Sequence, residues 1–132
     1  MKRIIAKHFD KINKILLNSD YYIDKTEKIS IFLKRKIKKK GKVFVCGNGG
    51  SFADASHFVG ELTATYSSKN RKSLPFILLG SNQAAVTAWS NDFDYKDYFN
   101  IFFISFVRNK LGFLHVVLIT CGLFVLHAFI VD

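Results

Sequence analysis

The sequence predicts an α/β domain with a parallel sheet, preceded by helices. One observation is the order of the segments between residues 42 and 90, where two short apolar runs alternate with two stretches of helical spacing. Strand, helix, strand, helix in this order is typical of α/β domains. The other observation is a glycine-rich turn, GNGGS at residues 47–51, which follows the first apolar run. At 132 residues the chain can hold one modest core.

Two helices are expected before the first strand. Residues 2–17 are amphipathic, and their apolar positions predict one buried stripe made of Ile4, Ile5, Phe9, Ile12, Ile15 and Leu16. The segment NSDYY interrupts this pattern, and a second helix is expected from about Asp24 to Lys40. Gly41 then stands where the C′ residue of a helix is usually found.

Two apolar runs predict the strands. KVFVCG, residues 42–47, is short, β-branched and closed by glycine, and LPFILLG, residues 74–80, repeats the apolar pattern. Runs of this kind are typical of strands buried on both faces of a parallel sheet.

A helix is expected after each strand. The first is predicted from Ser51 to about residue 66, with Ser51 as its N-cap and Asp54 as the capping-box partner. The second is predicted for SNQAAVTAWS, residues 81–90, beginning at a serine or asparagine cap.

The chain is strongly basic, with a formal net charge of +10, which favours an anionic partner such as nucleic acid, an acidic membrane or a phosphorylated small molecule. Six of the seven residues 34–40 (KRKIKKK) are basic. A nucleic-acid patch would usually add arginines and stacking aromatics, whereas lysines at a helix C-terminus complement its dipole. We therefore expect no nucleic-acid binding.

Cysteine usage and the N-terminus both indicate the cytoplasm. Cys46 and Cys121 show no CxxC spacing, which predicts reduced thiols in a cytoplasmic protein. The first 20 residues carry scattered charges, so they lack the apolar core of a signal peptide.

The GNGGS turn and the helix after it form a candidate anion site. Glycine permits close backbone approach, and the first N–H groups of a helix point outward at the positive end of its dipole. The turn matches neither GxGxxG nor GxxxxGK[ST], so it predicts neither a dinucleotide nor a triphosphate site. A tight connection without a ligand is the alternative.

His57 and Glu61 lie four residues apart, hence on one face of the expected helix. Such a pair can chelate a divalent metal, or one member can act as a base beside the other. A surface ion pair is the alternative, and the position of the pair just after the glycine turn favours a functional role.

The segments CGNGGSFADASHFVGELT and LPFILLGSNQAAVTAWSNDFDY resemble the sugar isomerase (SIS) domain family, and within it the phosphoheptose isomerases. The likeness covers about residues 40–99. It rests on the GNGGS turn, the ADAxH continuation, the glutamate four residues after the histidine, and TAxxND about thirty residues later. The resemblance implies a three-layer α/β/α sandwich around a parallel sheet, usually assembled as a homotetramer.

The resemblance also implies an activity. Phosphoheptose isomerases convert sedoheptulose 7-phosphate to D-glycero-D-manno-heptose 7-phosphate, towards the heptose of bacterial lipopolysaccharide or capsule. His57 and Glu61 would match two zinc ligands, and Glu61 would also match the base that moves a proton between C1 and C2. The residues implied to contact the sugar phosphate are Asn48, Gly49, Gly50, Ser51, Asn91 and Asp92.

The chain departs from this family in several places. Thr65 stands where an arginine is common, and Arg71 is the candidate replacement. A second phosphate loop of the form STSGNS is missing, as are a later glutamine and histidine that complete the metal site, since His115 and His127 lie in other surroundings. The sequence therefore predicts either a truncated isomerase that lacks half of the expected site, with its activity left open, or a non-catalytic sugar-phosphate binding module.

Residues 99–132 differ from the rest in composition, because 21 of these 34 residues are Phe, Leu, Ile or Val. The uncharged stretch 111–131 is long enough to span a bilayer, which would make this a membrane-anchored basic protein. An AT-rich gene read out of frame would give a stretch of this composition, and we favour a frameshifted or truncated isomerase. The predicted parts are an N-terminal helical segment (1–40), the first half of a SIS domain (41–98) and an atypical tail (99–132).

Overall fold

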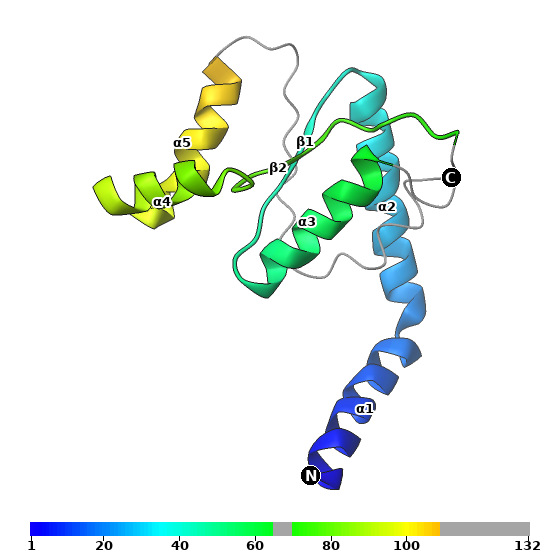
Figure 1. Cartoon of the computed structure of the whole chain (residues 1–132). Coiled ribbons are helices and arrows are strands. Elements are labelled where there is room, and N and C mark those ends of the chain that lie inside the picture. The colour runs from blue at the N-terminus through cyan, green and yellow to red at the C-terminus, as the bar shows by residue number, and fades with distance from the viewer. Residues whose placement is uncertain (65–69, 109–132) are drawn as a thin grey trace.

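The computed structural model describes residues 1–64 and 70–108 (Figure 1). The elements in chain order are α1 (Lys2–Leu17), α2 (Ser19–Lys38), β1 (Val43–Val45), α3 (Gly50–Thr63), β2 (Phe76–Leu78), α4 (Gln83–Asp92) and α5 (Tyr95–Arg108). Within the described residues, β1 and β2 form a parallel pair with Phe44 opposite Ile77. The predicted α/β class with a parallel sheet is therefore confirmed.

The two faces of β1 carry two separate hydrophobic clusters, because neighbouring strand residues point to opposite sides of a sheet. The cluster on one face joins α2 and α3 to the strands and consists of Leu33, Val43, Val45, Ala55, Phe58, Val59, Leu62 and Phe76. In Figure 1, α2 and α3 accordingly lie on one side of the strands and α4 and α5 on the other. The strands thus form the middle of three layers.

The second cluster faces α5. It consists of Phe44, Cys46 and Leu79, against which Phe99 and Phe102 of α5 pack. Burial raises the pKa of the Cys46 thiol. The predicted boundary between residues 98 and 99 falls inside α5, and the two phenylalanines just after it cover the sheet.

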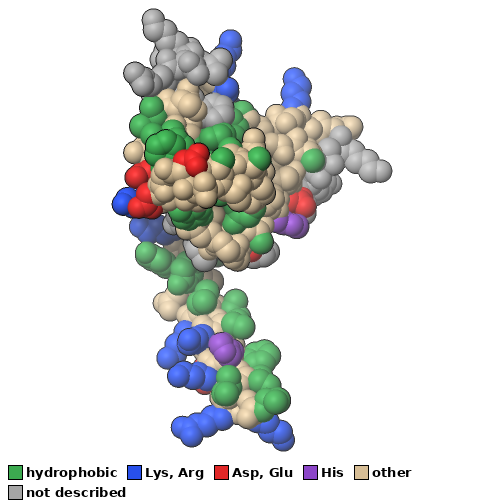
Figure 2. All heavy atoms as spheres, turned by 60° about the vertical axis from the view of Figure 1, so that its left-hand side comes forward, with side chains coloured by type: hydrophobic (Ala, Val, Ile, Leu, Met, Phe, Trp, Pro, Cys, Tyr) green, Lys and Arg blue, Asp and Glu red, His purple; other side chains and the backbone are tan. Residues whose placement is uncertain are grey.

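Helix α1 contributes no buried residue, so the predicted stripe is amphipathic but lies on the surface of the chain. Figure 1 shows α1 projecting from the rest of the molecule, and Figure 2 shows hydrophobic side chains along it opposite lysines and arginines. Phe9 remains 61% exposed and Leu16 63% exposed. A helix that extends away from the core in this way is left exposed by the rest of residues 1–64 and 70–108.

The break between α1 and α2 is shorter than the sequence predicts. Asn18 alone separates the two helices, and its Nδ2 donates to the carbonyl of Lys14 at 2.9 Å. Helix α2 therefore starts at Ser19 rather than near Asp24. The segment NSDYY forms one helix end and one helix start instead of a loop.

Helix α2 ends in a Schellman motif, with a lysine in the position where glycine is usual. Lys40 has a φ of 62°, and its N–H donates to the carbonyl of Ile37 at 2.9 Å. The N–H of Gly41 donates to the carbonyl of Lys36 at 2.9 Å. The prediction that Gly41 is the C′ residue is therefore wrong by one position.

No helix in residues 1–64 and 70–108 is long and apolar enough to cross a membrane. The stretch 111–131, on which the membrane hypothesis depends, lies outside the described residues. That hypothesis and the frameshift hypothesis both stay predictions.

Replacing Lys40 with glycine is expected to raise the free energy of unfolding by about 0.5–1 kcal/mol, because glycine adopts positive φ without crowding its Cβ. The matched control is Lys38→Gly, which removes the same charge from the last turn of α2 and is expected to cost about 1 kcal/mol. Urea unfolding of both variants measures the difference. Destabilisation of similar size in both variants would contradict the role of Lys40.

Candidate functional site

The glycine turn lies at the carboxyl end of β1 and leads directly into α3. Gly49 is the N-cap residue, with a φ of 54°, and its carbonyl accepts from the N–H groups of Phe52 at 3.1 Å and Ala53 at 3.3 Å. No side chain caps this helix, so the predicted capping box of Ser51 and Asp54 is wrong. The cap is therefore Gly49, two residues before the predicted Ser51, and it has a positive φ.

This turn leaves a run of backbone donors available. Among residues 1–64 and 70–108, no group accepts a hydrogen bond from the N–H of Asn48, Gly49 or Gly50. Consecutive unpaired N–H groups at a helix N-terminus are the usual backbone site for an anion. The geometry therefore supports the predicted anion site at Asn48, Gly49 and Gly50. Ser51 differs, because its N–H already donates to the carbonyl of Asn48 at 3.1 Å.

Gly47 allows the turn to be this tight. A Cβ at this position would lie 2.4 Å from the backbone oxygen of Ser51 and 2.8 Å from the nitrogen of Phe52. Gly50 is different, since no atom lies within 4 Å of a Cβ built there. The close packing of the end of β1 on the start of α3 thus depends on Gly47, which the sequence analysis placed in the GNGGS turn but did not name as a site residue.

A hollow of about 210 Å³ opens beside the turn. Its lining joins the turn to the start of α4 and to α5, and consists of Gly47, Asn48, Gly49, Phe52, Gly80, Gln83, Val86, Tyr95 and Phe99. Gly80, at the carboxyl end of β2, has a φ of 87° and lies against the Phe52 and Phe99 rings. The lining of the hollow therefore combines backbone donors with aromatic rings.

One side-chain contact spans the hollow. The hydroxyl of Tyr95 donates to Oδ1 of Asn48 at 2.5 Å. Sequence reasoning did not single out Tyr95, Gln83 or Gly80 as site residues. Tyr95 belongs to the NDFDY segment, and its position three residues after Asp92 was the sequence signal that could have pointed to it as a site residue.

His57 and Glu61 lie together on α3, as their spacing predicts. Nε2 of His57 is 3.6 Å from Oε1 of Glu61, and their side chains are 70% and 24% exposed. In the described part of the chain, no third His, Cys, Asp or Glu joins them in a metal-sized group. The pair can therefore supply two ligands to a metal, or a carboxylate base beside an imidazole.

The structure places Asn91 and Asp92 at the end of α4, where Nδ2 of Asn91 donates to Oδ1 of Asp92 at 2.9 Å. Neither residue lines the hollow. The opposite end of this helix lies at the hollow. Of the two predicted caps, serine or asparagine, the structure has Asn82, whose side chain accepts from the N–H of Ala85 at 3.1 Å.

Arg71 has a structural role that the sequence reasoning did not foresee. Its guanidinium donates to the carbonyls of Glu61 at 2.6 Å, Leu62 at 2.9 Å and Ala64 at 3.2 Å. These carbonyls lie at the C-terminus of α3, about 20 Å along the helix from the glycine turn. Arg71 thus caps α3 at the end remote from the turn. Thr65 lies outside the described residues.

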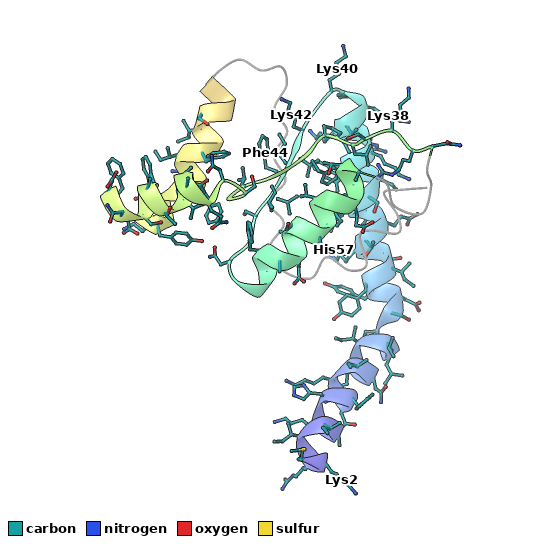
Figure 3. All side chains as sticks on the ribbon, viewed as in Figure 1. Lys2, Lys38, Lys40, Lys42, Phe44 and His57 are labelled. Carbon is teal, nitrogen blue, oxygen red and sulfur yellow. The ribbon has the colours of Figure 1, made fainter. Side chains whose placement is uncertain are left out.

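The basic cluster at residues 34–42 is separate from the hollow. Figure 3 shows Lys38, Lys40 and Lys42 at the end of α2 and the start of β1, with His57 away from them on α3. The glycine turn follows the opposite, carboxyl end of that strand. The helix-terminal interpretation of the cluster agrees with its place in the last turn of α2.

Comparison with known proteins identifies relatives of this chain. The chain is 36% identical over 100 residues to phosphoheptose isomerase 1 of Campylobacter jejuni, and 38% identical over 104 residues to the phosphoheptose isomerase of Aliarcobacter butzleri. Each alignment covers 76% of this chain and 53% of the relative. The chain is homologous to the phosphoheptose isomerases. It spans about half the length of the curated relatives it matches.

Solved structures agree with this homology to the phosphoheptose isomerases. The chain superposes on phosphoheptose isomerase GmhA of Neisseria gonorrhoeae with a TM-score of 0.66 at 25% identity, covering 98% of this chain and 66% of that one. The Francisella tularensis phosphoheptose isomerase gives a TM-score of 0.51 at 27% identity, covering 83% and 59%. No protein-family model matches the chain. The fold is thus that of the SIS domain in the phosphoheptose isomerases.

Gly47→Ala is expected to lower the free energy of unfolding by about 2 kcal/mol or more, because its methyl group would overlap the backbone of Ser51 and displace α3. Gly50→Ala is the matched control, since it adds the same methyl group in open space at the helix start. Thermal unfolding of both variants measures the contrast. Equal stability of the two variants would contradict the close approach at Gly47.

Proposed function

We propose that this chain binds a heptose phosphate, as the first half of a phosphoheptose isomerase site that interconverts sedoheptulose 7-phosphate and D-glycero-D-manno-heptose 7-phosphate. The observation that carries the proposal is the unpaired backbone N–H run at Asn48, Gly49 and Gly50, at the N-terminus of α3. A phosphate group carries the oxygens and negative charge that such a helix start attracts.

The proposed assignment of substrate contacts starts from this turn. Asn48, Gly49 and Gly50 offer backbone donors to the phosphate, and Ser51 adds a hydroxyl on the first turn of α3. Tyr95, Phe99 and Phe52 also line the hollow, where they limit the access of water to a bound sugar. We propose Asn91 and Asp92 as further substrate contacts only by homology, because they lie at the far end of α4.

Glu61 is the proposed base. An aldose–ketose interconversion removes a proton from one carbon and returns it to the neighbouring carbon, which requires a carboxylate or imidazole within reach of both. Glu61 is about three-quarters buried while His57 beside it is mostly exposed. A carboxylate that is partly shielded from water is better placed for transfer of a carbon-bound proton than an exposed one.

Zinc is the proposed metal, held in part by His57 and Glu61. A tetrahedral zinc ion with bonds of about 2.0–2.1 Å places two of its ligands roughly 3.3 Å apart, close to the 3.6 Å between these side chains. Bound zinc polarises a carbonyl oxygen as a Lewis acid. The two residues fit half of a four-ligand site, and they hold it on one face of α3.

A non-catalytic sugar-phosphate binding module is the second candidate. The observation that favours it is that His57 and Glu61 have no third ligand nearby among the described residues. The resemblance also implies a later glutamine as a metal ligand. The one glutamine in this sequence is Gln83, which lines the hollow beside the turn instead. Binding without turnover would be the outcome if the proton-transfer groups are incomplete.

We also propose that the chain assembles with copies of itself, in the cytoplasm. The apolar side chains of α1 that no part of the described chain covers support assembly, because a surface of this kind is usually buried in an interface. A homotetramer is the assembly implied by the family. The free, buried thiol of Cys46 agrees with a reducing compartment.

The full chain is expected to bind sedoheptulose 7-phosphate and to bind unphosphorylated sedoheptulose at least about tenfold more weakly, because the phosphate makes the charge-assisted contacts. Titration calorimetry measures both affinities. Proton NMR of the same mixtures detects an aldoheptose product, which would separate an isomerase from a binding module. Equal affinity for the two sugars would contradict the phosphate site.

His57→Ala is expected to weaken zinc binding by the full chain about tenfold or more, since loss of even an outer-shell group has an effect of that size. His8→Ala is the matched control, because it removes an imidazole from exposed α1. Competition with a chromogenic chelator measures both. Zinc affinity that is unchanged in His57→Ala would exclude the pair as ligands.

A further inference from the structure

The contact between Tyr95 and Asn48 joins two parts of the hollow that are 47 residues apart in the chain. Tyr95 is the first residue of α5, and Asn48 lies in the glycine turn between β1 and α3. The tyrosine hydroxyl donates to Oδ1 of the asparagine at 2.5 Å. This side-chain hydrogen bond links α5, which covers one face of the sheet, to the turn at the edge of the sheet.

The contact fixes the orientation of the Asn48 amide. An asparagine side chain has one oxygen that accepts and one NH₂ group that donates, held in a single plane. Because the oxygen is engaged by Tyr95, the NH₂ group must point elsewhere. Within the described residues, Nδ2 of Asn48 donates no hydrogen bond. It is therefore a preset donor beside the unpaired backbone N–H groups of the same turn.

The tyrosine is itself held in place by the core. Its ring meets the Phe99 ring edge-on, with centroids 5.9 Å apart and an interplanar angle of 78°. Phe99 packs against the buried cluster of Phe44, Cys46 and Leu79. The position of the hydroxyl is thus set by the docking of α5 on the sheet rather than by the exposed turn.

We infer that Tyr95 is a positioning residue: it holds the Asn48 amide so that its NH₂ group donates to an oxygen of the bound phosphate ester. This inference rests on the proposed function of the glycine turn. Tyr95 acts through Asn48. If Tyr95 only packed beside the hollow, replacing it would change the binding affinity equally with and without the Asn48 amide.

The test is a double-mutant cycle on the full chain, with sedoheptulose 7-phosphate as the probe in titration calorimetry. Tyr95→Phe keeps the ring and removes the hydroxyl, and it is expected to weaken binding about fivefold, the size of one neutral hydrogen bond. Asn48→Ala weakens binding by at least as much. In the Asn48→Ala background, adding Tyr95→Phe is expected to have no further effect.

Tyr98→Phe is the matched control. The Tyr98 hydroxyl is buried and has no hydrogen-bond partner among the described residues, and its ring packs on the same helix. Removing it is expected to leave the affinity unchanged. Thermal unfolding of every variant identifies any loss of binding that comes from loss of folding.

The outcomes separate the inference from the proposed function. Affinity unchanged by Tyr95→Phe, or lowered equally with and without Asn48, overturns the positioning role and leaves the phosphate site standing. No binding by the unmodified, folded chain overturns both. A fivefold loss that disappears in the Asn48→Ala background supports both.

Discussion

The parallel pairing of β1 with β2 is the constraint on which the rest of this structure depends. Parallel strands end at the same edge of a sheet, so the turn that follows β1 and the turn that follows β2 are brought side by side. Gly49 and Gly80 both have positive φ at that edge, and both line the hollow. The same pairing buries both faces of β1, which is why three strand residues are sufficient to join α2, α3 and α5 into one body.

Most of the architecture could be predicted from the sequence, because apolar spacing and glycine placement are local signals. The strands, their parallel order and a polar cap at the start of α4 all follow from such signals. Helix ends were less predictable. The sequence predicted Gly41 as the C′ residue of α2 and Ser51 as the N-cap of α3. Lys40 and Gly49 take these positions with positive φ, because the shape of each connection decides which residue must turn.

The candidate site shows the same division. The glycine turn and the His57–Glu61 pair lie within one short segment, so spacing alone indicates that they are neighbours. Tyr95 could not be found this way, since its contact with Asn48 exists only after α5 has docked on the sheet. Arg71 likewise looked available for a ligand, but the carbonyls at the end of α3 engage its guanidinium. Proximity in the fold, not residue type, assigns these roles.

The close approach at Gly47 also has a consequence for how this gene can vary. Every amino-acid change that a single nucleotide makes in a glycine codon introduces a Cβ, and any Cβ here would meet the backbone of Ser51 at 2.4 Å. Only third-base changes are then silent at this codon. Selection for a folded chain should therefore let the DNA drift at this codon while the protein stays fixed. Folding alone sets no such limit at Gly50, where the position of a Cβ is open.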